Sequence, residues 1–178
     1  MTQPSDKLLQ RAYAQDASIY QETPESVAFP KSAADVIVLV RSGAALIPRA
    51  AGTSLAGQVV GDGTVLDTGR HMNSILRINV EERWAEVQPG VVRDELNHHL
   101  NKYGLFFGPN TSTSNRCMMG GMVGNNSSGS TSISYGTTRE KLLGLELVTA
   151  DGVLRAMGAI DSEGVREIPE AVAQWLAQ

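Results

Sequence analysis

Two segments of the chain combine glycine with small polar residues in a way that suits the binding of an anion. The first is residues 48–57, PRAAGTSLAG, where small side chains leave consecutive backbone N–H groups uncovered. Consecutive N–H groups form a concave site that favours phosphate, while Arg49, Thr53 and Ser54 add positive charge and hydroxyl donors. The segment is neither a Gly-Lys-Ser/Thr phosphate loop nor a Gly-x-Gly-x-x-Gly fingerprint. By itself it leaves an ordinary glycine turn open as the alternative.

The second segment, residues 106–136, is crowded with Gly, Asn, Ser, Thr and Met and shows little periodicity. Irregular stretches of that length in compact domains are commonly functional or ordered by a ligand. Gly120 and Gly121 would let the main chain lie flat against a planar group or a diphosphate, and Asn125 and Ser128 can donate and accept at close range. Two such segments in one small domain indicate contact with one large ligand.

The remaining residues of chemical interest favour plain structural roles. His98 and His99 are adjacent in an expected helix, so they point about 100° apart and cannot grip one metal ion. Cys117 is the single cysteine, which excludes internal disulfides and cysteine-ligated zinc or iron–sulfur sites within this chain. We interpret Cys117 as an inert apolar residue, whereas Met122 and its neighbouring methionines could line a flat ring or fill a core. No metal site is expected.

Composition narrows the class of protein. The chain has 178 residues, 42% of them hydrophobic, and a formal net charge of −4. It has no cluster of Lys and Arg to follow a phosphate backbone, so nucleic acid is not an expected partner. The apolar runs, such as residues 36–40, are too short to span a bilayer, and the first ten residues lack a signal-peptide pattern. With its single cysteine, the chain is expected in the cytoplasm, and membrane docking through the rest of an enzyme stays open.

Strands and helices are expected to alternate around the two segments. We expect helices at residues 3–15, 33–41, 92–103 and 169–177, and strands at residues 26–29, 44–47, 64–67, 74–79, 83–88, 142–149 and 153–157. The order strand, helix, strand over residues 26–47 predicts a small parallel unit, with the first glycine segment directly after it. The later strands read as two antiparallel hairpins, and the fold class is therefore α+β.

Taken together, these motifs resemble the FAD-binding module of the vanillyl-alcohol-oxidase-like (PCMH-type) oxidases. The nearest branch is that of glycolate oxidase, D-lactate dehydrogenase and D-2-hydroxyglutarate dehydrogenase. The matching motifs, in chain order, are residues 16–20, 27–30, 48–57, 109–112, 120–129, 135–137 and 143–152. Residues 69–73 and 112–116 look most like the long bacterial enzymes that carry an iron–sulfur portion further on.

The resemblance implies a two-lobed domain that holds FAD in a cleft between its lobes. Residues 1–25 would form an N-terminal helix and lead-in, 26–68 the first FAD-binding lobe, 69–158 the second, and 159–178 a C-terminal helical tail of a truncated enzyme. The cofactor-binding residues carried over from the family are Arg49, Ala50, Ala51, Gly52, Thr53, Ser54, Leu55, Ala56, Gly57, Pro109, Thr111, Gly120, Gly121, Met122, Asn125, Ser128, Gly129 and Val148. None of the three histidines lies in residues 48–57, where some relatives attach flavin, so non-covalent FAD is expected.

The activity implied is oxidation of a D-2-hydroxy acid, such as D-lactate, glycolate or D-2-hydroxyglutarate, to the 2-oxo acid. The substrate domain and the catalytic base are missing, so the catalytic residues and the electron acceptor stay unknown and the fragment by itself is expected to be inactive. One departure is Met118, which stands where many relatives have a threonine. The alternatives are the FAD module of an aromatic alcohol oxidase or a cell-wall precursor reductase, and a non-catalytic ligand- or partner-binding module.

Overall fold

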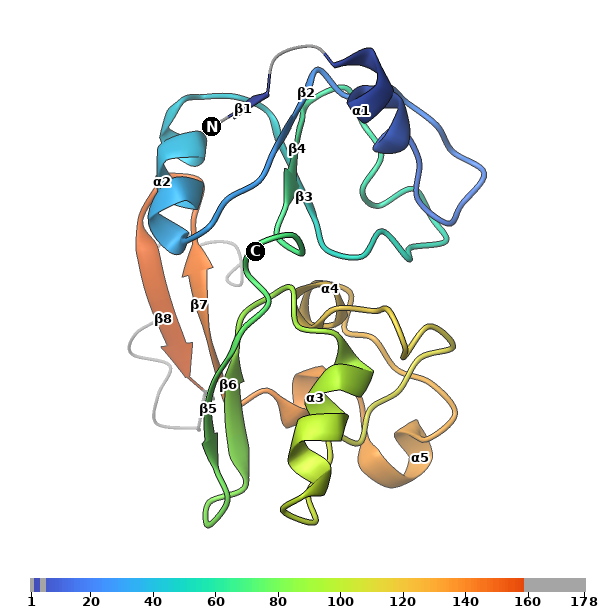
Figure 1. Cartoon of the computed structure of the whole chain (residues 1–178), viewed down its shortest axis with the longest axis vertical. Helices are drawn as coiled ribbons and strands as arrows, with labels where there is room; N and C mark the ends of the chain where they lie inside the picture. Colours follow the sequence, from blue (N-terminus) through green and yellow to red (C-terminus); the bar gives the residue numbers. More distant parts are fainter. Residues whose placement is uncertain (1, 4–5, 159–178) are drawn as a thin grey trace, which may run out of the picture.

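The computed structural model describes residues 2–3 and 6–158 and shows two groups of elements stacked along the long axis (Figure 1). The first group comprises β1 (Thr2–Gln3), α1 (Lys7–Ala12), β2 (Ser26–Ala28), α2 (Ala33–Arg41), β3 (Leu46–Arg49) and β4 (Thr64–Asp67). The second comprises β5 (Ile75–Asn79), β6 (Trp84–Val87), α3 (Arg93–Asn101), α4 (Met119–Gly124), α5 (Ser132–Tyr135), the 3₁₀ turn η1 (Arg139–Lys141), β7 (Gly144–Val148) and β8 (Leu154–Gly158). The expected α+β class is confirmed.

The first group is built on a four-stranded sheet with the order β1-β2-β4-β3. Strands β2, β4 and β3 run parallel, and β1 pairs antiparallel with β2. The inner strand β4 carries buried Val65 and Leu66, as an apolar run in a parallel sheet should. Helix α2 makes the crossover, and the hydroxyl of Ser32 caps it by accepting from the N–H of Asp35 at 3.3 Å. The predicted strand–helix–strand unit is therefore present.

Strand β3 lies two residues later than predicted. We expected residues 44–47, but the strand continues through Pro48 to Arg49. Pro48 is tolerated because β3 is an edge strand, where one side of the chain needs no ladder hydrogen bond. The shift places the first glycine loop directly at the carboxyl end of the sheet.

The second group has a separate apolar core beneath the hairpin β5–β6. Its buried members are Val91, Leu96, Leu100, Cys117, Met119 and Met122, drawn from α3, α4 and their connections. Both hairpins appear where the sequence predicts them, and the second, β7–β8, packs against α2 of the first group (Figure 1). The burial of Cys117 confirms its assignment as an apolar filler.

Two further predictions of secondary structure are wrong. The expected helix 3–15 is shorter, because Thr2–Gln3 forms β1 and Asp6 caps α1 by accepting from the N–H of Leu8 at 2.9 Å. The stretch 106–136, expected to be irregular, contains α4 and α5. The predicted helix 169–177 lies outside the described residues. Across residues 2–3 and 6–158, no helix combines the length and hydropathy needed to cross a membrane.

Candidate functional site

The first glycine loop, residues 50–57, leaves β3 and turns on two glycines. Gly52 and Gly57 have φ of +64° and +70°, a region that residues with a Cβ rarely adopt. Within the described part of the chain, no hydrogen bond uses the backbone N–H of residues 51–55 as donor. Five successive N–H groups without a partner in the described chain are compatible with the anion-binding role that the sequence predicts.

Two of the three polar side chains expected to help in this loop, those of Ser54 and Arg49, also stabilise its conformation. The hydroxyl of Ser54 accepts from the N–H of Ala56 at 3.2 Å and from that of Gln58 at 3.3 Å. Arg49 donates from Nη1 to the carbonyl of Gln15 at 2.9 Å, and its guanidinium fills the space that a Cβ on Gly52 would need. Arg49 therefore places a positive charge beside the loop and also packs against it at Gly52.

The second segment contributes the short helix α4, whose first two glycines, Gly120 and Gly121, have different surroundings. A Cβ on Gly120 would lie 2.6 Å from Cβ of Pro89, and the N–H of Gly120 donates to the carbonyl of Pro89 at 2.8 Å. Gly120 thus allows close packing within the protein. Gly121 is exposed, and its neighbour across the gap is Ala50 of the first loop, 3.2 Å from the position of a Cβ. Of these two glycines, Gly121 is the one that is open to a ligand.

The two segments meet, as one shared ligand requires. Besides the approach of Gly121 to Ala50, the side-chain amide of Gln58 donates to Oδ1 of Asn125 at 3.0 Å. An open pocket of about 500 Å³ adjoins the first loop. Its lining is Ala12, Tyr13, Arg49, Ala50, Ala51, Asp67, Gly69, Arg70 and Met118. The pocket is therefore lined by residues that precede, form and follow the first loop, and by Met118, which precedes α4.

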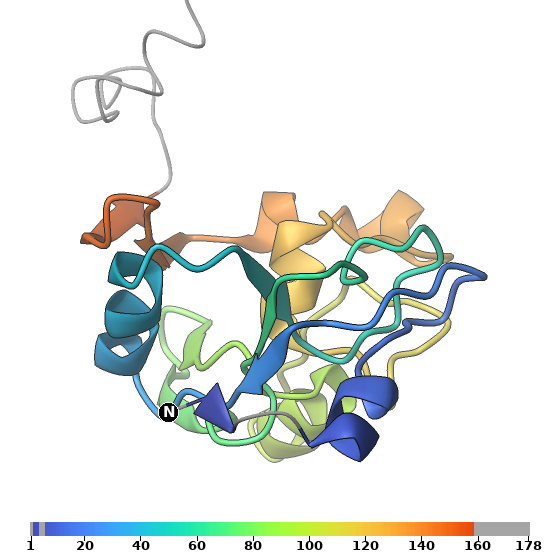
Figure 2. The same cartoon turned by 90° about the horizontal axis from the view of Figure 1, so that it is seen from above.

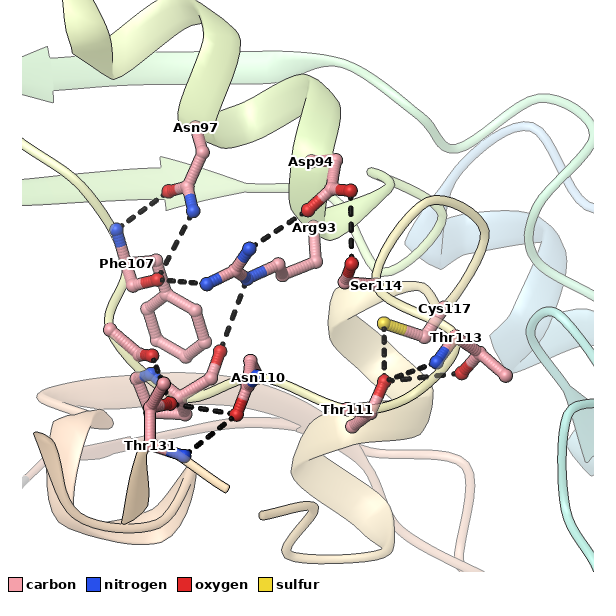
Figure 3. A network of polar contacts seen from close by, with 12 residues as sticks. Arg93, Asp94, Asn97, Phe107, Asn110, Thr111, Thr113, Ser114, Cys117 and Thr131 are labelled. Atoms are coloured by element: carbon pink, nitrogen blue, oxygen red, sulfur yellow. Dashed lines mark hydrogen bonds and ion pairs between the residues drawn. The ribbon is translucent and has the colours of Figure 1, made fainter. Parts of the chain in front are cut away.

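The approach to α4 is held in place by a polar network that starts on α3 (Figure 3). Arg93 donates to the carbonyls of Pro109 (3.1 Å) and Phe107 (3.0 Å) and to the carboxylate of Asp94 (2.8 Å). Asn97 binds both the N–H and the carbonyl of Phe107, at 2.6 and 3.2 Å. The hydrogen bond from Arg93, against the opposing effect of burial, lowers the pKa of Asp94. This network, together with the burial of Cys117, Met119 and Met122, holds the segment in one conformation.

The other predicted residues of the second segment divide between structure and surface. The Thr111 hydroxyl lies 3.1 Å from the hydroxyl of Thr113 and 3.3 Å from the sulfur of Cys117, and Pro109 is fully buried. The side chain of Met122 is 1% exposed and packs in the core, which agrees with the core-filler interpretation. Ser128 and Gly129 are exposed, and Gly129 lies close against the backbone of Asn110.

The structure does not bring Val148 to the two loops. Val148 ends β7, which pairs with β8 and packs against α2. Figures 1 and 2 both show this hairpin on the opposite side of the first sheet from the loop that follows β3. The family-based role of Val148 stays a prediction.

Sequence reasoning missed the groups on the other wall of the pocket. The hydroxyl of Tyr13 donates to Oδ2 of Asp67 at 2.5 Å, and Oδ1 of Asp67 accepts from the N–H of Gly69 at 2.7 Å. Burial, together with the hydrogen bond to Asp67, raises the pKa of Tyr13. The Asp-Thr-Gly sequence directly after an apolar strand, typical of an Asx turn at a sheet edge, could have pointed to Asp67.

Positive charge faces this pocket from two sides. The guanidinium of Arg70 lies 4.5 Å from the ring centroid of Phe29, and that of Arg49 lies 5.2 Å from the ring centroid of Tyr13. In the described part of the chain, neither arginine forms an ion pair with a carboxylate. The described residues contain no group of three or more His, Cys, Asp or Glu side chains that could hold a metal ion.

The chain is similar to known flavoproteins in sequence and in structure. A family model described as "FAD binding domain" matches residues 24–158. The D-2-hydroxyglutarate dehydrogenase of Pantoea ananatis is 43% identical over 92% of this chain, which covers 16% of that relative's length. Glycolate oxidase subunit GlcD of Bacillus subtilis is 32% identical over 83% of the chain, and the chain covers 33% of it. A crystal structure of the 6-hydroxy-D-nicotine oxidase of Arthrobacter nicotinovorans superposes with a TM-score of 0.76 at 27% identity, covering 89% of this chain and 35% of that one.

Proposed function

The chain belongs to the FAD binding domain family, and from that premise we propose that it is the cofactor-binding part of a D-2-hydroxy-acid dehydrogenase, with D-2-hydroxyglutarate as the first candidate substrate. The observation that carries the substrate choice is sequence identity. The chain is 43% identical to a D-2-hydroxyglutarate dehydrogenase but 32% identical to a glycolate oxidase subunit. Neither a cell-wall precursor reductase nor an aromatic alcohol oxidase is favoured by these relatives.

The cofactor is FAD, and the residues of the two segments fit it. The fit rests on the unpaired N–H groups of residues 51–55, which suit a diphosphate, and on exposed Gly121 beside them. Bound FAD supplies the redox chemistry, since its flavin can accept a hydride from the alcohol carbon of a 2-hydroxy acid. The remaining carried-over residues, from Pro109 to Gly129, would position the other parts of the cofactor. Non-covalent binding stays a prediction.

We place substrate recognition outside this chain. The chain spans 16% of the length of the Pantoea ananatis dehydrogenase that it resembles. We therefore propose that residues 26–68 and 69–158 form the two FAD-binding lobes and that the substrate clamp and base belong to the rest of the enzyme. A cytoplasmic location remains a proposal, based on the single, buried cysteine.

Two measurements test this function. First, FAD is titrated into the purified 178-residue chain and followed by tryptophan quenching, with riboflavin as the control that lacks the diphosphate. Tight binding of FAD and weak binding of riboflavin is the expected result. Second, the full-length enzyme is assayed with D-2-hydroxyglutarate, D-lactate and glycolate and an artificial electron acceptor, with this chain alone as the inactive control. Equal or greater kcat/KM for glycolate would overturn the choice of substrate.

A further inference from the structure

Residues 13–20, which follow α1, lie along the first glycine loop. The N–H of Ala17 donates to the carbonyl of Ser54 at 3.1 Å, and the carbonyl of Gln15 accepts from Arg49 at 2.9 Å. At the end of the loop, the ring of Tyr20 fills the space beside Gly57, where a Cβ would come within 2.9 Å of it. Figures 1 and 2 both show the chain after α1 running beside the loop after β3.

This segment is held in one conformation by its own hydrogen bonds. Oδ1 of Asp16 accepts from the N–H of Ser18 at 2.8 Å, and the hydroxyl of Ser18 accepts from the N–H of Tyr20 at 3.1 Å. The N–H of Glu22 donates to the carbonyl of Ala14 at 2.8 Å and closes the turn at its base. A turn with hydrogen bonds of its own can support a neighbouring loop, because it adds fixed contacts to it.

The contacts lie at the two positions of the glycine loop where the backbone has a positive φ. Both glycines with positive φ are covered by a side chain, Gly52 by Arg49 and Gly57 by Tyr20. Arg49 is in turn anchored to the carbonyl of Gln15. The loop between these points keeps its N–H groups at residues 51–55 without partners in the described chain. A loop fixed in this state loses less conformational freedom when a diphosphate binds.

We infer that residues 13–20 are a brace that sets the conformation of the FAD-binding loop before the cofactor arrives, with Tyr20 and Gln15 as positioning residues. The brace precedes residues 24–158, the part that the family model matches. The inference rests on the proposed role of residues 50–57 in holding FAD. It assigns a function in cofactor affinity to a segment outside the two glycine-rich segments.

Tyr20→Ala in the full 178-residue chain tests the brace, with two matched controls. Tyr20→Phe keeps the ring beside Gly57, and Ile19→Ala truncates a neighbouring side chain that is 94% exposed. Two quantities are measured for each variant: the hydrogen exchange of the amides of Ala56 and Gln58 without cofactor, which donate to the hydroxyl of Ser54, and the Kd for FAD. Tyr20→Ala should speed exchange in the loop and raise the Kd by about tenfold, the size expected for lost packing of an aromatic ring. Exchange in β4 should stay at its wild-type rate in Tyr20→Ala. Both control variants should keep the wild-type loop exchange and the wild-type Kd for FAD.

The proposed role of residues 13–20 is wrong if Tyr20→Ala and Ile19→Ala have the same loop exchange and the same Kd for FAD. If the wild-type chain fails to bind FAD, the proposed function falls, and the exchange measurement alone decides the brace. If Tyr20→Ala does not fold, Tyr20→Leu replaces it, because leucine keeps apolar bulk but cannot cover Gly57 as a ring does. Rapid exchange in the loop of wild-type protein, equal to that of Tyr20→Leu, would then contradict the inference.

Discussion

The side-chain amide of Gln58 donates a hydrogen bond to Oδ1 of Asn125 at 3.0 Å and joins two segments that lie 67 positions apart in the chain. Gln58 follows the first glycine loop, and Asn125 ends α4. Next to this bond, Gly121 lies against Ala50. The two segments of the candidate site are therefore in contact, and the bond between them is accessible to mutation because both side chains are exposed.

Removing this bond should weaken FAD binding more than it weakens the fold. Gln58→Ala and Asn125→Ala each remove one exposed partner, so each should lower the free energy of unfolding by no more than about 1 kcal/mol. The Kd for FAD should rise severalfold in each, since the spacing of the two segments is no longer fixed. In a double-mutant cycle the effects on Kd should be less than additive, because the second substitution has no bond left to break. Fully additive effects would show that the bond plays no part in binding.

The glycines with positive φ offer a test that separates backbone strain from cofactor binding. Gly43 and Gly52 have φ of +74° and +64°, but a Cβ on Gly43 would meet nothing within 4 Å, whereas one on Gly52 would displace Arg49. Each change to alanine should lower the free energy of unfolding by about 1–2 kcal/mol, the cost of a left-handed residue with a Cβ. Gly52→Ala should also raise the Kd for FAD at least about tenfold. A similar rise in Gly43→Ala would mean that global destabilisation, and not the loop, controls affinity.

Much of this fold could be predicted from local signals. Ser32 as N-cap and Ser42-Gly43 as a stop signal predict the two ends of helix α2, and the helix spans the predicted residues. The hairpin β5–β6 follows from alternation on both sides of a turn. Strand β3 was misplaced because Pro48 normally ends a strand, and the sequence does not show which strand lies at an edge of the sheet.

The sequence predicted the backbone loop of the candidate site but not the contacts that hold the site in place. Glycine and alanine in residues 50–57 are a local signal, and they predicted a loop in which the N–H groups of residues 51–55 have no partner among the described residues. Helix α4 was missed because its sequence, MGGMVG, is poor in helix formers; burial of Met119 and Met122, three positions apart, stabilises it. Tyr13 meets Asp67 across 54 positions, a contact that only the tertiary fold can reveal.

The network around Arg93 should contribute far more to stability than a surface ion pair does. The side chain of Arg93 is 15% exposed and holds the carbonyls of Pro109 and Phe107, so Arg93→Ala leaves both without this donor. We expect a loss of about 2–3 kcal/mol in the free energy of unfolding. Arg77→Ala is the control, because Arg77 pairs with Glu86 at the surface with 70% of its side chain exposed, and it should lose about 0–1 kcal/mol. Urea unfolding followed by circular dichroism compares the two variants, and equal losses would contradict the role of the network.

The bond between Tyr13 and Asp67 should make stability fall at alkaline pH. Burial and the hydrogen bond to Asp67 raise the pKa of Tyr13 above its ordinary value of 10.0. Above about pH 10 the unfolded chain therefore releases this proton while the folded chain keeps it, so the contribution of Tyr13 is complete below that pH and declines as the pH rises. Tyr13→Phe lacks this proton and should be less stable than wild type at pH 8, with a gap that narrows between pH 10 and pH 11. Urea unfolding at these pH values measures the gap, Tyr103→Phe controls for the loss of a hydroxyl elsewhere, and a gap that stays constant or widens would show that the proton of Tyr13 is not held by the fold.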